Sequence, residues 1–209
     1  MRMLRRALSL EEVSDGVAIA EIEHQIYGRL VNVADLLQAH SKEYQEQWQI
    51  KIPKTDANAD KGNIRIRMTI PGVIGDGKAE YVLTTKNSTE QEGGMNEVPI
   101  PTTEDNFKQF KLLCEGGMVK DRYFFPIPDT ELEWHVDCFY LPGAAIGSGK
   151  YHEWVKIDLE VQDITAPLPH LPVKLDNVII NQEGKRTAEE EAQVRSLYDN
   201  EFVTKNRLI

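Results

Sequence analysis

The chain has 209 residues, enough for one domain with a sizeable core, and we expect a single domain over 1–209. Its formal net charge of −10 excludes tight non-specific binding to nucleic acid or to an anionic membrane. No apolar run is long enough to span a bilayer, and the first residues lack the apolar stretch of a signal peptide. Because the two cysteines have no metal-binding spacing, we predict reduced thiols and a cytoplasmic protein.

Period-two alternation of polar and apolar residues is the dominant pattern, beginning with a strand over 17–30. It predicts further strands at about 45–52, 63–70, 78–86, 95–100, 118–125, 131–141 and 151–163. Helices are expected at about 34–40, 103–114 and 188–201, the last opening with a capping box of Thr187 and Glu190. About eight strands with few helices predict an α+β, mostly β fold: an eight-stranded antiparallel closed barrel or tunnel with covering helices. The core spans about 17–163, and 164–209 form a C-terminal extension.

The polar sides of four predicted strands carry an ordered set of charges. Each of these strands has two like charges, two residues apart, which therefore share one face. The pairs are Glu21 and Glu23, Arg65 and Arg67, Lys120 and Arg122, and Asp158 and Glu160. If these faces point inward, they line a charged, hydrated tunnel, and the apolar faces point outward and need covering by the three helices. The alternative is that they are ordinary solvated strand faces, the usual meaning of one such pair taken alone.

The two kinds of charge suit a polyphosphate and a divalent metal. Carboxylate oxygens at the two acidic pairs are the ligands that Mg²⁺ or Mn²⁺ favours, together with phosphate oxygens. Arginine grips phosphate bidentately, and lysine contributes a point charge. The candidate phosphate-binding cations are Arg65, Arg67, Lys86, Lys120 and Arg122.

Six short motifs follow one another in a characteristic order. They are Glu21-Ile22-Glu23-His24-Gln25, Arg65-Ile66-Arg67, Leu83-Thr84-Thr85-Lys86, Lys120-Asp121-Arg122, Val136-Asp137-Cys138-Phe139 and Lys156-Ile157-Asp158-Leu159-Glu160. Over about residues 17–163 this order resembles the CYTH superfamily, the triphosphate tunnel metalloenzymes. That group includes thiamine and inorganic triphosphatases, class IV adenylyl cyclases and fungal-type RNA triphosphatases.

The resemblance implies an eight-stranded tunnel and assigns roles to single residues. The metal-side carboxylates would be Glu21, Glu23, Asp158 and Glu160, with Asp137 beside them inside the tunnel, and the five cations above would hold the phosphates. The sequence departs from the family at two positions, which we place among the catalytic candidates. Gln25 stands where the opening motif has lysine, and Lys156 stands near the first acidic position of the closing strand, where its charge could replace the missing one.

Three functions are therefore open. The first is metal-dependent hydrolysis of a triphosphate-bearing small molecule, nucleotide or RNA end, and the second is cyclisation of a nucleoside triphosphate. The third is binding of phosphorylated ligands without turnover, which Gln25 and Lys156 motivate. Oligomeric state is open, with a homodimer among the possibilities. The glycine-rich segment 143–150 lacks the first glycine and the Ser/Thr of a phosphate loop, so we interpret it as a flexible connection between strands.

Overall fold

The computed structural model describes residues 19–21, 23–51, 63–72, 78–88, 95–114, 116–161, 167–181, 187–198 and 203–205. Eleven strands lie within them: β1 (Ile19–Glu21), β2 (Glu23–Leu30), β3 (Ser41–Lys51), β4 (Asn63–Pro71), β5 (Glu80–Ser88), β6 (Met95–Pro101), β7 (Gly116–Pro126), β8 (Glu133–Tyr140), β9 (Tyr151–Glu160), β10 (Leu175–Asn181) and β11 (Val203–Lys205). The helices are a 3₁₀ helix η1 (Val33–Gln38), α1 (Glu104–Lys111) and α2 (Ala188–Ser196).

The strands form one antiparallel sheet in the order β1-β6-β5-β4-β3-β7-β8-β9-β2-β10, with β11 added beside β7. The mostly β, antiparallel prediction is confirmed, but the described residues contain eleven strands rather than eight. The hydrogen-bond path does not join its two ends, so a barrel closed by hydrogen bonds stays a prediction. One residue separates the terminal strand β1, paired with β6, from β2, which pairs with β9 and with the other terminal strand, β10.

The outer face of the sheet is apolar, as the alternation predicted. Over β3 to β5 it packs Trp48 and Ile66 against Phe107 and Cys114, from α1 and the turn after it. Thr103 caps α1 by accepting a hydrogen bond from the Asn106 amide, which fixes where the helix begins. A larger outer cluster of buried residues combines β2, β7, β8 and β9 with η1 and the segment before β10. Its members are Ile26, Leu36, Phe125, Trp134, Val136, Cys138, Val155, Ile157, Leu159 and Val173.

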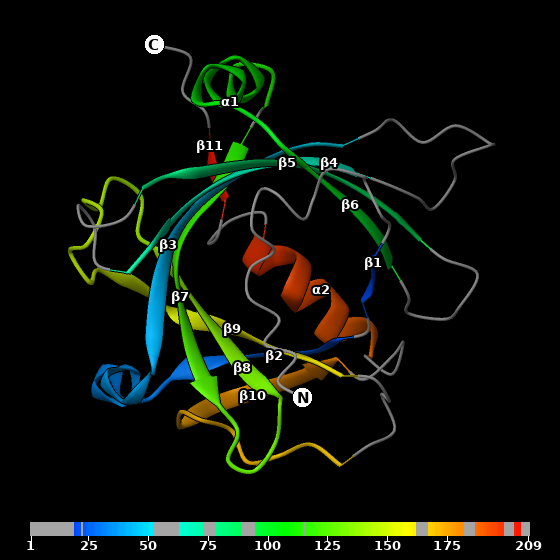
Figure 1. Cartoon of the computed structure of the whole chain (residues 1–209). Helices are drawn as coiled ribbons and strands as arrows, with labels where there is room; N and C mark the ends of the chain where they lie inside the picture. Colours follow the sequence, from blue (N-terminus) through cyan, green and yellow to red (C-terminus); the bar gives the residue numbers. More distant parts are fainter. Residues whose placement is uncertain are drawn as a thin grey trace.

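Helix α2 contradicts one expectation, since it does not cover the outer face. Figure 1 shows it within the curve of the sheet. Val194 of α2 and Leu197, just after it, pack against Tyr27, Phe139 and Trp154. These three aromatic residues lie on the same face of the sheet as the charged residues of their strands. The predicted capping box is present, but the regular α-helix ends at Ser196 rather than near 201. The helix therefore fills one end of the inner face with apolar side chains.

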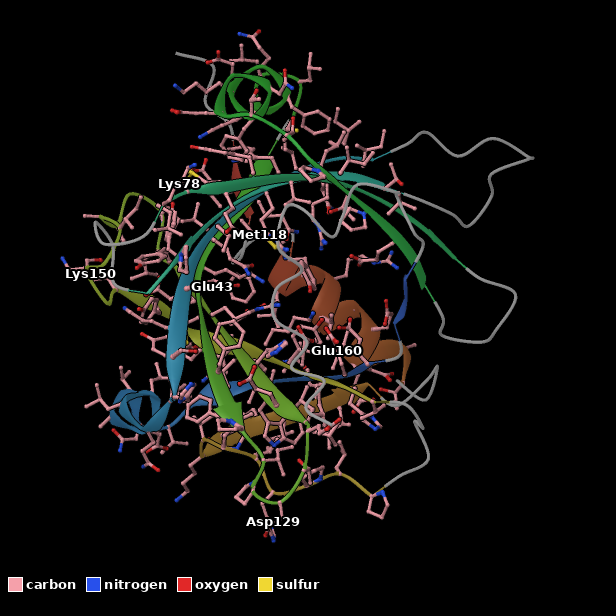
Figure 2. The ribbon with its side chains drawn as sticks, in the orientation of Figure 1. Glu43, Lys78, Met118, Asp129, Lys150 and Glu160 are labelled. Atoms are coloured by element: carbon pink, nitrogen blue, oxygen red, sulfur yellow. The ribbon has the colours of Figure 1, made fainter. Side chains whose placement is uncertain are left out.

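The C-terminal extension also contributes strands to the sheet. These strands were not predicted, because prolines at 167, 169 and 172 interrupt regular structure just before them. After the prolines β10 pairs with β2, from Leu175 opposite Leu30 to Asn181 opposite Gln25. The glycine-rich segment 143–150 links β8 to β9 through exposed turns, and Figure 2 places Lys150 at the periphery of the molecule. Among the described residues, none of the helices has the length and apolar character needed to cross a membrane.

Candidate anion site on the inner face

Cross-strand register places the predicted charged residues on one face of the sheet. Asp158 on β9 lies opposite Gln25 on β2, and Lys156 lies opposite Asp137 on β8. Asp137 in turn lies opposite Arg122 on β7. Farther along the sheet, Gln47 and Gln49 of β3 lie opposite Arg67 and Arg65 of β4. Because alternate side chains share a face, these residues line the concave side that also holds α2.

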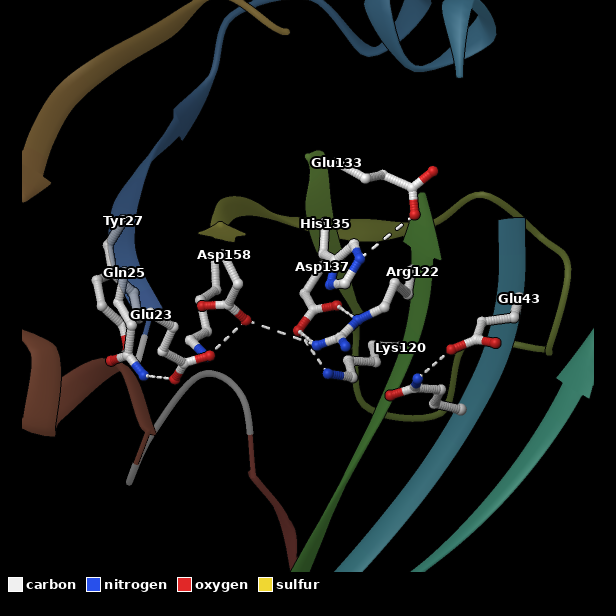
Figure 3. Close-up of polar contacts among 12 residues, drawn as sticks. Glu23, Gln25, Tyr27, Glu43, Lys120, Arg122, Glu133, His135, Asp137 and Asp158 are labelled. Carbon is white, nitrogen blue, oxygen red and sulfur yellow. Dashed lines mark hydrogen bonds and ion pairs between the residues drawn. The ribbon is translucent and has the colours of Figure 1, made fainter. Parts of the chain in front are cut away.

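Asp137 is the centre of the cluster, with no exposed surface. Its Oδ2 accepts hydrogen bonds from Lys120 Nζ at 2.5 Å and Arg122 Nη2 at 2.9 Å, and its Oδ1 accepts from Arg122 Nε at 2.7 Å (Figure 3). Burial alone would raise the pKa of Asp137, but Arg122 and Lys120 hold it well below its usual range. Burial and the neighbouring Arg122 charge lower the pKa of Lys120 to about 7.

A second ion pair joins Lys156 and Asp158, both on β9. Lys156 Nζ lies 2.7 Å from Asp158 Oδ2, and Arg122 Nη2 lies 3.6 Å from the same oxygen. The other oxygen, Oδ1, is buried without a hydrogen-bond partner in the described part of the chain. Burial raises the pKa of Asp158, and the nearby Glu23 charge acts in the same direction. Burial opposes the charge on Lys156, yet Asp158 and Glu23 raise its pKa well above the usual value.

Gln25 connects the acidic strand to α2. Its side-chain amide donates to Glu23 Oε1, and its carbonyl oxygen accepts from the Tyr27 hydroxyl at 3.3 Å. The Tyr27 hydroxyl also lies 3.1 Å from that of Tyr198, just after α2. Burial strongly raises the pKa of Tyr27, so the phenol stays protonated and can donate. A neutral hydrogen-bonded row thus links Tyr198 to Glu23.

The two arginines of β4 differ in their partners. Arg65 Nη2 forms an ion pair with Glu97 of β6 at 3.1 Å, and both side chains are largely buried. Arg67 forms no ion pair with any described residue, and its buried Nε has no hydrogen-bond partner among them. Burial, together with the charges of Arg65 and Arg122, lowers the pKa of Arg67 to about 10. Arg67 is therefore a partly buried cation that forms no ion pair within the described residues, although the charges of Glu43 and Asp137 favour its protonated form.

The predicted metal ligands have different surroundings in the part of the chain that the structure describes. No group of three or more His, Cys, Asp or Glu side chains suited to a metal ion occurs within the described residues. Asp137 and Asp158 form ion pairs with lysine and arginine side chains of the chain itself, and Glu160 is exposed. Glu21 lies on β1 and Lys86 on β5 opposite Glu97, but their side chains lie outside the described residues. The described residues therefore contain no preformed carboxylate cluster for Mg²⁺ or Mn²⁺, and the metal stays a prediction.

Several residues that form ion pairs or hydrogen bonds in the sheet were not singled out from the sequence. Glu97 had no charged neighbour two residues away to mark it, although it is 7% exposed and pairs with Arg65. Glu43 was in phase with the predicted β3 face and accepts a hydrogen bond from Gln45. Asp121, between Lys120 and Arg122, faces the opposite side of the sheet. There it is buried and accepts hydrogen bonds from the hydroxyls of Tyr140 at 3.0 Å and Tyr151 at 2.6 Å.

Comparisons with known proteins do not assign the chain to a family. No family model matches it, and no curated protein matches it. Solved structures that resemble it include a Pyrococcus horikoshii protein, with 20% identity, a TM-score of 0.42 and coverage of 68% of this chain and 79% of that one. A conserved hypothetical protein of Pyrococcus furiosus has 18% identity, a TM-score of 0.40 and coverage of 89% and 97%. A provisionally assigned adenylate cyclase of Bacillus halodurans has 14% identity, a TM-score of 0.39 and coverage of 69% and 82%.

Proposed function

We propose that the inner face binds a small molecule bearing a polyphosphate, such as a nucleotide or inorganic triphosphate. The observation that carries this proposal is Arg67, an inward cation with a buried, unpartnered Nε. A buried polar atom without a hydrogen-bond partner costs stability, and an anion bound beside Arg67 would supply that partner. The planar guanidinium offers parallel N–H donors that match two phosphate oxygens.

The neighbours of Arg67 favour an anion with several charges. The positive charges of Arg65 and Arg122 lie close enough to lower the pKa of Arg67, so three guanidinium groups face one region. A single carboxylate or inorganic phosphate could contact only part of this region, whereas a chain of phosphates can bridge the guanidinium groups. The buried Lys120 beyond Arg122 extends the positive stretch across β7.

Hydrolysis and cyclisation stay predictions that rest on the sequence resemblance. Both need the ligand to be held first, so binding is the function that the geometry supports most directly. Phosphate or cyclic nucleotide release, assayed with Mg²⁺ and with Mn²⁺, would extend the proposal from binding to turnover.

Calorimetric titration with tripolyphosphate, ATP and pyrophosphate tests the binding proposal. Replacing Arg67 by methionine removes the guanidinium with little change in volume, and we expect affinity to fall about tenfold or more, the loss of one bidentate contact. Arg29→Met is the matched control. Arg29 is exposed and pairs at 3.2 Å with the exposed Glu153, so its removal should leave affinity unchanged.

The stability of the same variants gives an independent readout. Arg67→Met should raise the unfolding temperature, because it removes a partly buried charge that forms no ion pair within the described residues. Arg65→Met should lower it, because it removes the largely buried ion pair with Glu97. Failure of the wild-type protein to bind any of the three anions would overturn the proposal, as would wild-type affinity in Arg67→Met.

A further inference from the structure

Lys156 occupies the place between carboxylates where a divalent cation could otherwise sit. Its ammonium group lies 2.7 Å from Asp158 Oδ2, and only 13% of its side chain is exposed. Across the β2–β9 ladder Glu23 lies opposite Glu160 and Gln25 opposite Asp158, so the carboxylates of Glu23 and Asp158 are near neighbours on one face. Figure 3 shows these two carboxylates turned toward the same region.

Two carboxylates this close repel one another unless a proton, a metal ion or an ammonium group lies between them. Glu23 and Asp158 are near enough for Glu23 to disfavour the charge on Asp158, and both stabilise the charge on Lys156. The neutral amide of Gln25 donates to Glu23 as well. Side chains of β2 and β9 thus supply the positive charge and the donor that this pair requires.

The ammonium group of Lys156 would repel a divalent cation that approached these two carboxylates. Asp158 keeps one buried oxygen, Oδ1, without a partner in the described residues, so the acidic pair retains coordinating capacity that Lys156 opposes. Asp137, the next carboxylate on this face, is already bound by Lys120 and Arg122.

We propose that Lys156 is the resident cation of the Glu23–Asp158 pair and that the inner face binds its phosphate ligand without a divalent metal. This inference rests on the proposed binding function. It explains why Gln25 can be neutral, since the positive charge that balances the acidic pair comes from the neighbouring strand. In this arrangement Lys156 is a specificity-determining residue, which selects the metal-free polyphosphate over its magnesium complex.

Two measurements on the intact chain test it. Titration with tripolyphosphate in metal-free buffer containing EDTA should give the full affinity of the wild-type protein. Electron paramagnetic resonance of Mn²⁺, in the absence of phosphate, should show no tight site on wild-type protein, and a new site on Lys156→Gln that disappears in Lys156→Gln/Asp158→Asn. Lys150→Gln, which removes an exposed loop lysine, is the matched control and should behave as wild type.

The outcomes separate the two proposals. Tripolyphosphate binding that appears only when Mg²⁺ or Mn²⁺ is added would leave the binding function intact and overturn the role of Lys156. A tight Mn²⁺ site on wild-type protein that Asp158→Asn removes would also overturn it. Absence of a Mn²⁺ site on a folded Lys156→Gln variant would show that the lysine does not hold the metal off. Absence of tripolyphosphate binding under every condition would defeat the binding function, whatever Mn²⁺ does.

Discussion

Replacing Asp137 by asparagine should destabilise the protein more than any other single change on the inner face. Asp137 has no exposed surface and accepts three hydrogen bonds, at 2.5, 2.7 and 2.9 Å, from Lys120 and Arg122. Asparagine preserves the shape but removes the carboxylate that binds Lys120 and Arg122, and Arg122 then keeps only its 3.6 Å contact with Asp158. Breaking a buried ion pair by removing one partner costs about 3–5 kcal/mol. For a chain of this length that loss lowers the unfolding temperature by roughly 6–20 °C.

The size of the loss should depend on pH in a defined direction. Because the pKa of Lys120 is already lowered to about 7, the uncompensated ammonium of the variant can release its proton in alkaline solution. Thermal unfolding followed by circular dichroism should therefore show a larger difference from wild type at pH 6 than at pH 9. Tripolyphosphate at a hundredfold excess over its dissociation constant should stabilise the wild type by about 2.7 kcal/mol. The same concentration should stabilise the variant by more, because the anion replaces the lost carboxylate.

The control is an ion pair of the same chemistry in water. Glu153→Gln breaks the contact between Glu153, whose side chain is 60% exposed, and Arg29, whose side chain is 46% exposed. It should cost no more than about 1 kcal/mol. If Asp137→Asn unfolds within about 2 °C of wild type, or no further below it than Glu153→Gln, the ion-pair network does not stabilise the fold as argued.

Three further results are expected. Gly117→Ala should cost about 2–3 kcal/mol in chemical denaturation, because a Cβ there would lie 2.4 Å from the Trp48 ring and 2.7 Å from a backbone oxygen. Gly72→Ala should cost about 1–2 kcal/mol, because a Cβ there meets no atom and only the positive φ opposes it. Thr187→Ala should cost about 1 kcal/mol by removing the cap of α2, with Thr187→Ser close to wild type. Lys120 is mostly neutral at pH 8, and a bound anion favours its charged form, so tripolyphosphate binding at that pH should take up protons. Calorimetry in buffers of different ionisation enthalpy measures this uptake, and Lys120→Met should abolish it.

Local patterns in the sequence predicted the strands and their faces well. Alternation around Arg65 and Arg67 places both on the concave side, and Ile66 between them is buried outside against α1. The capping box at Thr187 located the start of α2 to the residue. These features depend only on neighbours in the chain, and a pattern of neighbours is what a single sequence records.

Long-range choices were not readable in the same way. A cap shows where a helix begins but not which surface it packs against, so nothing placed Val194 against Tyr27 and Phe139 on the inner face. The ion pairs depend equally on register between distant strands. Lys120 reaches Asp137 because β7 and β8 align at that point, and a shift of one residue would turn one of the two side chains to the outer face.

The junction between β1 and β2 has a consequence for how the sheet comes apart. β1 is the terminal strand on one side of the sheet, whereas β2, which starts two residues after β1 ends, lies next to the other terminal strand, β10. Within the described residues, three pairs from Ile19–Glu97 to Glu21–Met95 secure β1. Seven aligned positions, by contrast, secure β2 to β9, and β2 is also paired with β10 on its other side. Amide exchange should therefore be faster along β1 than along β2, and β1 should be the first strand to separate from the sheet.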